Sequence, residues 1–147
     1  MRRTKCRRQQ GSVLVELVLV LPLMLSFLLF VSEGAAMVHA HQVINNAARE
    51  GARASAVPEN KCIGETASGC LASIQQVAIA YAQENGVSLN IANVAVDQSV
   101  QILNGAVAIR ASRVSITYPY QLRYLPNIAG MASALNLVGS AEFRNLY

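Results

Sequence analysis

The sequence lacks the short motifs that mark the common enzyme classes. It has no Gly-x-x-x-x-Gly-Lys phosphate loop, no His-Glu-x-x-His zinc motif and no Gly-x-Ser-x-Gly nucleophile motif. Its two histidines, His39 and His41, are two positions apart, so on a helix they point about 200° away from each other and cannot share a metal ion. We therefore expect no enzymatic activity, no metal site and no cofactor.

Acidic residues are absent from the leader, residues 1–11, which contains five of the twelve Lys and Arg residues. The remaining chain has seven basic and eight acidic residues, so the net charge of +4 comes from this one block. A nucleic-acid-binding protein would instead place its basic residues on a folded face, and we expect no nucleic-acid partner. A basic block beside an apolar segment predicts that the N-terminus stays in the cytoplasm.

Charged residues are nearly absent from the 19-residue hydrophobic run Val13 to Val31, where Glu16 is the exception. A helix of this length spans about 28 Å, close to the roughly 30 Å hydrocarbon core of a bilayer. We therefore predict one transmembrane helix over residues 12–31. A carboxylate in hydrocarbon costs on the order of 2.5 to 3.5 kcal/mol. Glu16 either pairs with a cation, or it reaches the membrane surface or is protonated near it, and the residues alone leave both interpretations open.

The leader and the hydrophobic run leave three fates for the N-terminus. The run is an uncleaved anchor, a secretory signal cut after Ala40, or a segment cut on the cytoplasmic side after Gly11. Cleavage after Gly11 would create an ammonium group on Ser12, which a neighbouring copy could place against Glu16. Such a buried pair adds little net stability, but an unpaired Glu16 is costly, so pairing would fix the axial offset between subunits.

A resemblance to a known family is carried by two segments in order. Residues 11–23 read Gly-Ser-Val-Leu-Val-Glu-Leu-Val-Leu-Val-Leu-Pro-Leu, and residues 45–53 read Asn-Asn-Ala-Ala-Arg-Glu-Gly-Ala-Arg. Together they resemble the TadE-like pseudopilins, which are minor pilins of the Tad (Flp) pilus within the type IV pilin superfamily. Residues 114–144 resemble the C-terminal part of these proteins less specifically. The resemblance implies cleavage after Gly11 by a prepilin peptidase and a need for Glu16 in assembly.

The resemblance also implies partners and a location. The partners are other pilins and minor pilins of the Tad system, the prepilin peptidase, the inner-membrane assembly platform and membrane lipid. The protein would cross the bacterial inner membrane once, with its C-terminal domain outside the cytoplasm, and reach the pilus after assembly. Two residues depart from the pattern: Leu17, where Tad pilins often carry Phe or Tyr, and Ser12, which bears on N-methylation. The alternative function is an uncleaved anchor that presents a small binding domain.

Pro22 lies inside the hydrophobic run, where it has no N–H to donate to the carbonyl of Val18. A kink or a loosened turn is expected, although membrane helices also tolerate prolines for packing reasons. The resemblance implies a helix that bends when it moves from bilayer to filament. No proline follows until Pro58, so the helix should continue out of the membrane to about residue 57. A stripe of small residues on it favours a core face over a subunit contact: Ala36, Ala40, Val43, Ile44, Ala47, Gly51 and Ala54.

Residues 32–147 predict one α+β domain outside the cytoplasm. Cys62 and Cys70 would lie on the oxidising side of the membrane and close a small ring, so we predict a disulfide. Cys6, in the leader, would be removed by the cut. Helical spacing from Leu71 to Asn85, with Gly86 as the stop, predicts a second helix.

The sequence after this helix has the alternating pattern of β-strands, beginning at Leu89. The Asn104-Gly105 pair predicts a hairpin turn. The apolar positions shift from odd to even near Ser112 and Arg113, which predicts a bulge or a break. Residues 135–144 predict a closing strand. We expect a pilin-like fold in which a small antiparallel sheet of three or four strands packs against the long N-terminal helix and the second helix.

Three tyrosines, Tyr118, Tyr120 and Tyr124, surround Pro119. They either form an exposed patch for adhesion or subunit docking, or they finish a strand and cover the edge of the core. The second interpretation is the more usual for such residues.

Overall fold

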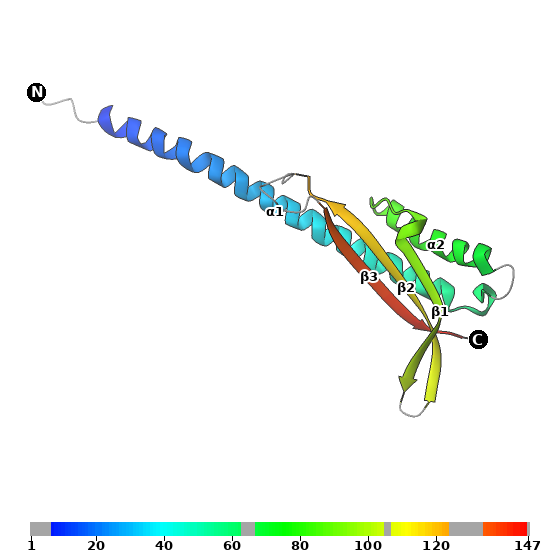
Figure 1. Ribbon diagram of the computed structural model, residues 1–147. Helices are drawn as coiled ribbons and strands as arrows, with labels where there is room; N and C mark the ends of the chain where they lie inside the picture. Colours follow the sequence, from blue (N-terminus) through cyan, green and yellow to red (C-terminus); the bar gives the residue numbers. More distant parts are fainter. Residues whose placement is uncertain (1–6, 63–66, 105–106, 124–133, 147) are drawn as a thin grey trace, which may run out of the picture.

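The computed structural model describes residues 7–62, 67–104, 107–123 and 134–146. Helices, short 3-10 turns and strands follow one another along this part of the chain. Their bounds are α1 Arg7–Ser55, η1 Pro58–Asn60, α2 Ala67–Glu84, η3 Ile91–Asn93, β1 Val94–Asn104, β2 Val107–Gln121 and β3 Ala134–Arg144. The strands form one antiparallel sheet in the order β1-β2-β3. The predicted α+β fold with a small antiparallel sheet is confirmed (Figure 1).

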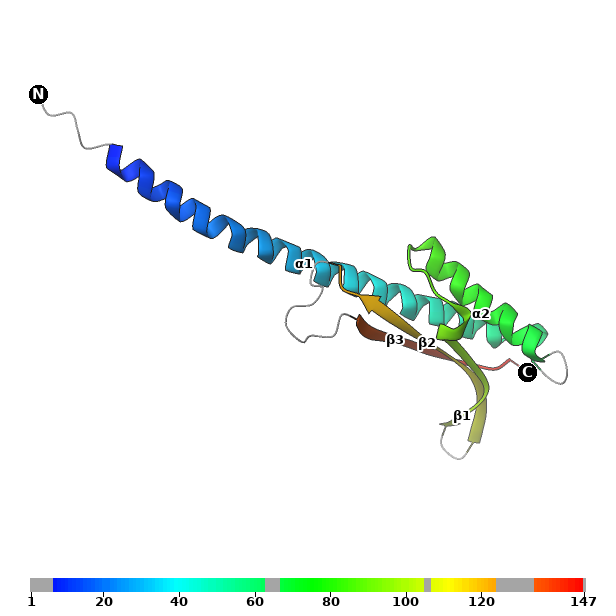
Figure 2. The ribbon, with the colours of Figure 1, turned by 45° about the horizontal axis from the view of Figure 1, so that its top comes forward.

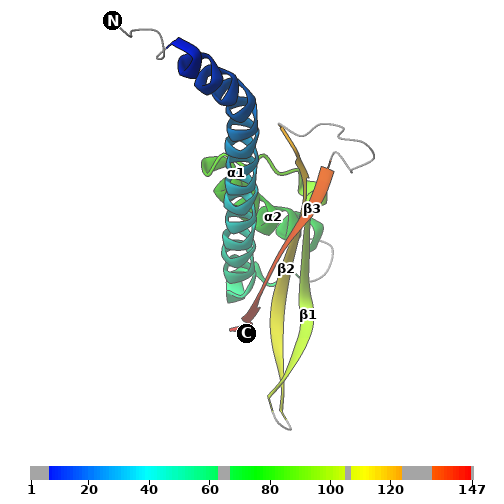
Figure 3. The ribbon, with the colours of Figure 1, turned by 90° about the vertical axis from the view of Figure 1, so that its left-hand side faces the viewer.

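α1 is one continuous helix of 49 residues. Its N-terminal half extends away from the rest of the molecule, and its C-terminal half packs against the sheet and α2 (Figures 1 and 2). Pro22 lies within the helix, and the Ser26 hydroxyl donates a hydrogen bond of 2.8 Å to the Pro22 carbonyl. The helix therefore does not break at the proline, and Figure 3 shows that its N-terminal half curves.

The C-terminal half of α1 supplies most of the small residues of the core. The buried members are Ala40, Val43, Ile44, Ala47, Ala48, Gly51 and Ala52. They pack in one cluster with Ala78 of α2, Val94 of β1 and Val114 of β2. The predicted core face is therefore confirmed, except that Ala36 is exposed and Ala54 is only half-buried.

Two glycines lie where α1 closely approaches its neighbours. A Cβ atom built on Gly139 of β3 would lie 3.0 Å from the carbonyl oxygen of Ile44. A Cβ atom on Gly51 would lie 3.2 Å from the Cβ atom of Ala78 in α2. Because a glycine has no side chain, the helix lies directly on β3 at Gly139 and on α2 at Gly51. This close packing fixes the C-terminal half of α1 relative to the sheet.

The second helix and the first strand differ from the prediction at their ends. α2 begins at Ala67, four residues before the predicted start. Gly86 has a φ of 79°, which is the left-handed conformation that ends helices, so the predicted stop is confirmed. Leu89 and Ile91 are not in a strand, because the Asn90 side chain caps the turn η3 by accepting from the N–H of Ala92. Leu89 is nevertheless buried in the core.

β1 and β2 form the predicted hairpin, but Asn104 is the last residue of β1 and pairs with Val107, so the connection begins one residue later than the predicted Asn104-Gly105 turn. Residues 105 and 106 lie outside the described part of the chain. The predicted break in the strand pairing occurs beside Ser112, as expected, but the extra residue is on β1 and not on β2. Two pairs bracket it, Asp97 with Arg113 and Val100 with Ala111. Gln98 and Ser99 of β1 therefore lie opposite the single residue Ser112 of β2, which is a bulge in β1. β3 confirms the predicted closing strand.

Candidate functional site

The N-terminal half of α1 exposes a long apolar surface. Every large hydrophobic side chain from Val13 to Val31 is exposed by at least two-fifths, and Leu19 is 74% exposed. Among the described residues, α1 is the one helix long and apolar enough to cross a membrane. A patch of this size on a folded protein needs lipid or another protein to cover it.

The predicted processing and assembly residues lie along this half of α1. Gly11, Ser12, Glu16 and Pro22 are all within the one helix, and the side chain of Glu16 is exposed. Ser12 and Glu16 are four residues apart in α1, so their backbone positions are about 6 Å apart along the helix axis, close to one turn. The protein's own domain does not cover Glu16, so the contacts of this carboxylate are open to lipid or a second protein.

A second carboxylate, Glu33, lies where the apolar run meets the folded domain, and the sequence pattern did not predict a role for it. Its side chain is 4% exposed. Glu33 Oε1 accepts hydrogen bonds from the Tyr120 hydroxyl at 2.9 Å and from the Arg123 N–H at 3.1 Å. The pair therefore joins α1 to the end of β2. The available signal was that Glu33 is the first charged residue after the apolar run and that no other follows until Arg49.

The tyrosines near Pro119 serve the core rather than an exposed patch. Tyr120 is 7% exposed and belongs to the core cluster, and Tyr118 packs against it. Burial, followed by the hydrogen bond to Glu33, raises the pKa of Tyr120 above its ordinary value. The interpretation as the edge of the core is confirmed for these two residues, whereas Tyr124 lies outside the described part of the chain.

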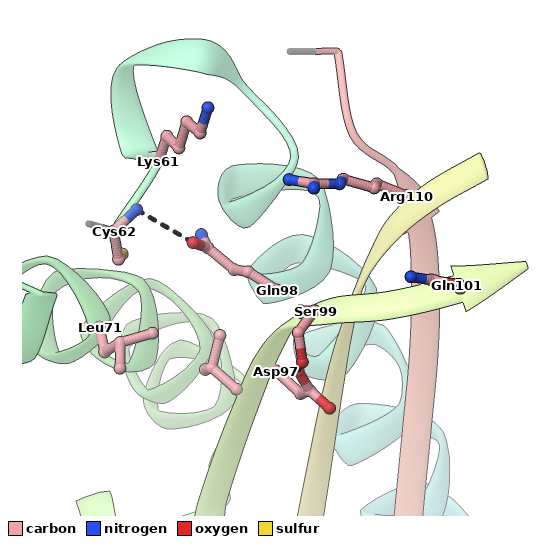
Figure 4. Close-up of a pocket in the computed structure, with 9 residues that line it drawn as sticks. Lys61, Cys62, Leu71, Asp97, Gln98, Ser99, Gln101 and Arg110 are labelled. Atoms are coloured by element: carbon pink, nitrogen blue, oxygen red, sulfur yellow. Dashed lines mark hydrogen bonds between the residues drawn. The ribbon is translucent and has the colours of Figure 1, made fainter. Parts of the chain in front are cut away.

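The opposite end of the domain contains a shallow cavity of about 470 Å³ beside the disulfide (Figure 4). The predicted bond between Cys62 and Cys70 is present. Lys61 and Arg110 line the cavity together with Asp97. The Ser99 hydroxyl and N–H donate to the Asp97 carboxylate and lower the pKa of this group, which keeps it ionised. In the described residues no group of three His, Cys, Asp or Glu side chains could hold a metal ion.

Gln98, at the bulge, is the centre of the polar network behind this cavity. Its amide nitrogen donates to the carbonyl oxygens of Ser55 at 3.2 Å and Asn60 at 2.8 Å, and to the Ser55 hydroxyl at 2.9 Å. Its amide oxygen accepts from the N–H of Cys62 at 3.0 Å. One side chain thus connects β1 to the end of α1, to η1 and to the disulfide. Its bonds are used to hold elements together, which marks it as a structural residue.

Replacement of Gln98 by alanine should lower the free energy of unfolding by about 1 kcal/mol, because three partly buried backbone groups lose a partner and water replaces only part of it. Denaturant unfolding of the detergent-solubilised protein measures the change. Gln101→Ala is the matched control, because Gln101 lines the same cavity but is exposed. Equal stability of the two variants would contradict this role for Gln98.

The fold and the exposed half of α1 define a class: an α+β protein with one N-terminal helix long and apolar enough to span a membrane. Within it, residues 11–53 match the family model described as TadE-like protein. The match confirms the resemblance seen in the sequence and relates the chain to TadE-like proteins of the Tad pilus system. It includes Glu16, Pro22 and Glu33. No curated protein and no solved structure matches the chain.

Proposed function

We propose that the protein is a structural minor pilin, or pseudopilin, that takes part in the biogenesis of a Tad (Flp) pilus. The observation that carries the proposal is the division of α1 within the TadE-like segment. Its first half is apolar and uncovered, and its second half is buried in a domain with its own core. The domain of such a protein can lie in water on one side of the membrane. The apolar half of α1 needs lipid or other helices to cover it.

We further propose that a prepilin peptidase cuts the chain after Gly11 and that Glu16 then guides assembly. The cut creates an ammonium group on Ser12, about one helical turn from Glu16. A neighbouring subunit can bring its Ser12 ammonium to Glu16 only when the two parallel helices are displaced along their axes by about one turn. The Glu16 side chain spans part of this distance, so the displacement needed is somewhat smaller. An unpaired carboxylate is costly in a dry environment, so this contact selects one offset among many.

The partners and location follow from the same proposal. The protein lies in the bacterial inner membrane, with its N-terminus in the cytoplasm and its domain outside, until it joins the pilus. The disulfide supports this orientation, because such bonds persist in oxidising compartments. The proposed partners are other Tad pilins and minor pilins, the prepilin peptidase, the assembly platform and membrane lipid.

The first test is the intact mass of the protein extracted from membranes of cells with and without the prepilin peptidase. We expect a chain that begins at Ser12 in the first case and at Met1 in the second. A start at Met1 in both cases would contradict processing and favour the alternative, an uncleaved anchor that presents a binding domain. A start at His41 would mean a secreted domain and would overturn both proposals.

A further inference from the structure

The domain begins to cover α1 almost as soon as the apolar run ends. Val31, the last residue of the run, is 50% exposed, whereas Glu33 is 4% exposed and Met37 already packs against the core. α1 is a continuous helix across this boundary, so no flexible linker separates the apolar half from the domain. The position of the domain along the membrane normal is therefore set by the position of the helix.

Glu33 also fixes which part of the domain comes closest to the apolar run. Its carboxylate is bonded to the Tyr120 hydroxyl and the Arg123 N–H, at the end of β2. Tyr120 pairs with Leu135 at the start of β3. The end of β2 and the start of β3 are thus held beside residue 33, while Figures 1 and 3 show the β1–β2 hairpin at the far end of the domain.

We propose that this end of the sheet, formed by Arg123 and Leu135 beside Tyr120, lies in the lipid headgroup layer and contacts anionic headgroups. The inference rests on the proposed function only in that α1 spans the membrane. Glu33 is two residues beyond Val31, which is about 3 Å along a helix. The headgroup region is roughly 5 to 8 Å thick on each side of the hydrocarbon core. Groups hydrogen-bonded to Glu33 therefore fall within it.

The composition of this end fits a lipid surface. Leu135 is 42% exposed, and Arg123, two residues beyond the end of β2, has an exposed cationic side chain. The acidic side chains on the described strands, Asp97 and Glu142, both lie opposite Arg113. Arg113 is seven residues before Tyr120, or about 23 Å along the strand. The carboxylates on the described strands are therefore far from this end, and the carboxylate that lies at it, Glu33, is buried and accepts hydrogen bonds from Tyr120 and Arg123.

Single tryptophans test this placement, because the chain has none of its own. The full-length protein is inserted in vesicles of phosphatidylethanolamine and phosphatidylglycerol that contain a lipid with a nitroxide on its headgroup. Three variants sample the sheet at increasing distance from the membrane: Leu135→Trp, Val138→Trp and Leu103→Trp. Val138 is about 10 Å further along β3 than Leu135, and Leu103 is on the far hairpin and 77% exposed.

We expect the nitroxide lipid to quench Leu135→Trp several-fold more than Leu103→Trp, with Val138→Trp between them, and acrylamide in the buffer to show the reverse order. Equal lipid quenching of the three would overturn the inference. Protection of Leu135→Trp from acrylamide without lipid quenching would also overturn it, because another protein surface would then cover this end.

A fourth variant, Leu25→Trp, separates this inference from the proposed function. Leu25 lies in the apolar run, so lipid brominated on its acyl chains should quench it if α1 spans the bilayer. Loss of that signal would contradict the membrane-spanning helix itself. A strong signal from Leu25→Trp with none from Leu135→Trp would leave the anchor in place and refute the lipid contact of the sheet. Val138→Trp, on the same strand, shows whether a substitution there is compatible with folding.

Discussion

Replacement of Glu16 by alanine should leave the protein in the membrane and exclude it from pili. Alanine removes the cost of a carboxylate from the apolar run, so insertion should be at least as favourable as in the wild type. The variant also removes the one charged group that could meet the Ser12 ammonium of a neighbouring subunit. Without that pair no single offset between helices is preferred, and incorporation should fall to the background level. Immunoblots of sheared pili and of membranes measure both quantities.

Two further substitutions make the experiment specific. Leu17→Ala changes the adjacent residue, which is 56% exposed, and should retain incorporation because it removes no charge. Glu16→Asp retains the charge on a side chain shorter by one methylene, so it should assemble better than the alanine variant. Incorporation of Glu16→Ala at the wild-type level would contradict the role of Glu16. A loss of incorporation for Leu17→Ala as severe as for Glu16→Ala would show that apolar packing, and not the carboxylate, controls assembly.

Hydrophobic periodicity predicts those helices and strands of this fold that have one face in the core and the other in solvent. The stripe on α2, with Ile74, Ala78 and Ala82 buried, follows the helical spacing visible in the sequence. The first seven residues of β1 and the middle of β3 follow the alternation expected of strands with one buried face, whereas residues 101–103, near the hairpin turn, are all exposed. Leu89 shows the limit of the method, because a buried side chain in a loop contributes to the same alternation as one in a strand.

The bulge illustrates what periodicity does not contain. The shift of apolar positions on β2 shows that the ladder changes register, but it does not show which strand has the extra residue. That residue is on β1 because Gln98 bonds to Ser55 and Asn60, which are 43 and 38 positions away in the sequence. Contacts over such distances depend on the assembled tertiary structure, and no local pattern reports them.

Some residues of the candidate site could be predicted from the sequence, and Glu33 could not. Gly11, Ser12 and Glu16 stand out because a basic leader, a lone carboxylate and an apolar run occur in order, and their roles in processing and assembly remain predictions. Glu33 has no such context, since a single acidic residue after a membrane segment is ordinary. Its partner Tyr120 is 87 residues away, and only the folded chain brings them together.

Replacement of Tyr120 by phenylalanine should lower the free energy of unfolding by about 1.5 to 3 kcal/mol, the usual cost of removing a hydrogen bond to a charged group. The hydroxyl is within 2.9 Å of a carboxylate that is almost fully buried, so water cannot easily take its place. Denaturant unfolding of the detergent-solubilised protein measures the loss. Tyr118→Phe is the control, because the Tyr118 hydroxyl makes no hydrogen bond within the described part of the chain. Equal effects of the two substitutions would contradict a specific role for the Glu33 contact.

The same pair predicts a dependence on alkaline pH. Burial and the bond to Glu33 raise the pKa of Tyr120 above its ordinary value of 10.0. The unfolded chain therefore loses this proton at a lower pH than the folded chain does. The stability contributed by neutral Tyr120 is complete below about pH 10 and declines as the pH rises through the raised pKa. Above about pH 10 the free energy of unfolding of the wild type should fall faster than that of Tyr120→Phe. The difference in free energy of unfolding between the two proteins therefore becomes smaller as the pH rises. A difference that stays constant across this range would show that the lost stability does not come from the hydrogen bond between Tyr120 and Glu33.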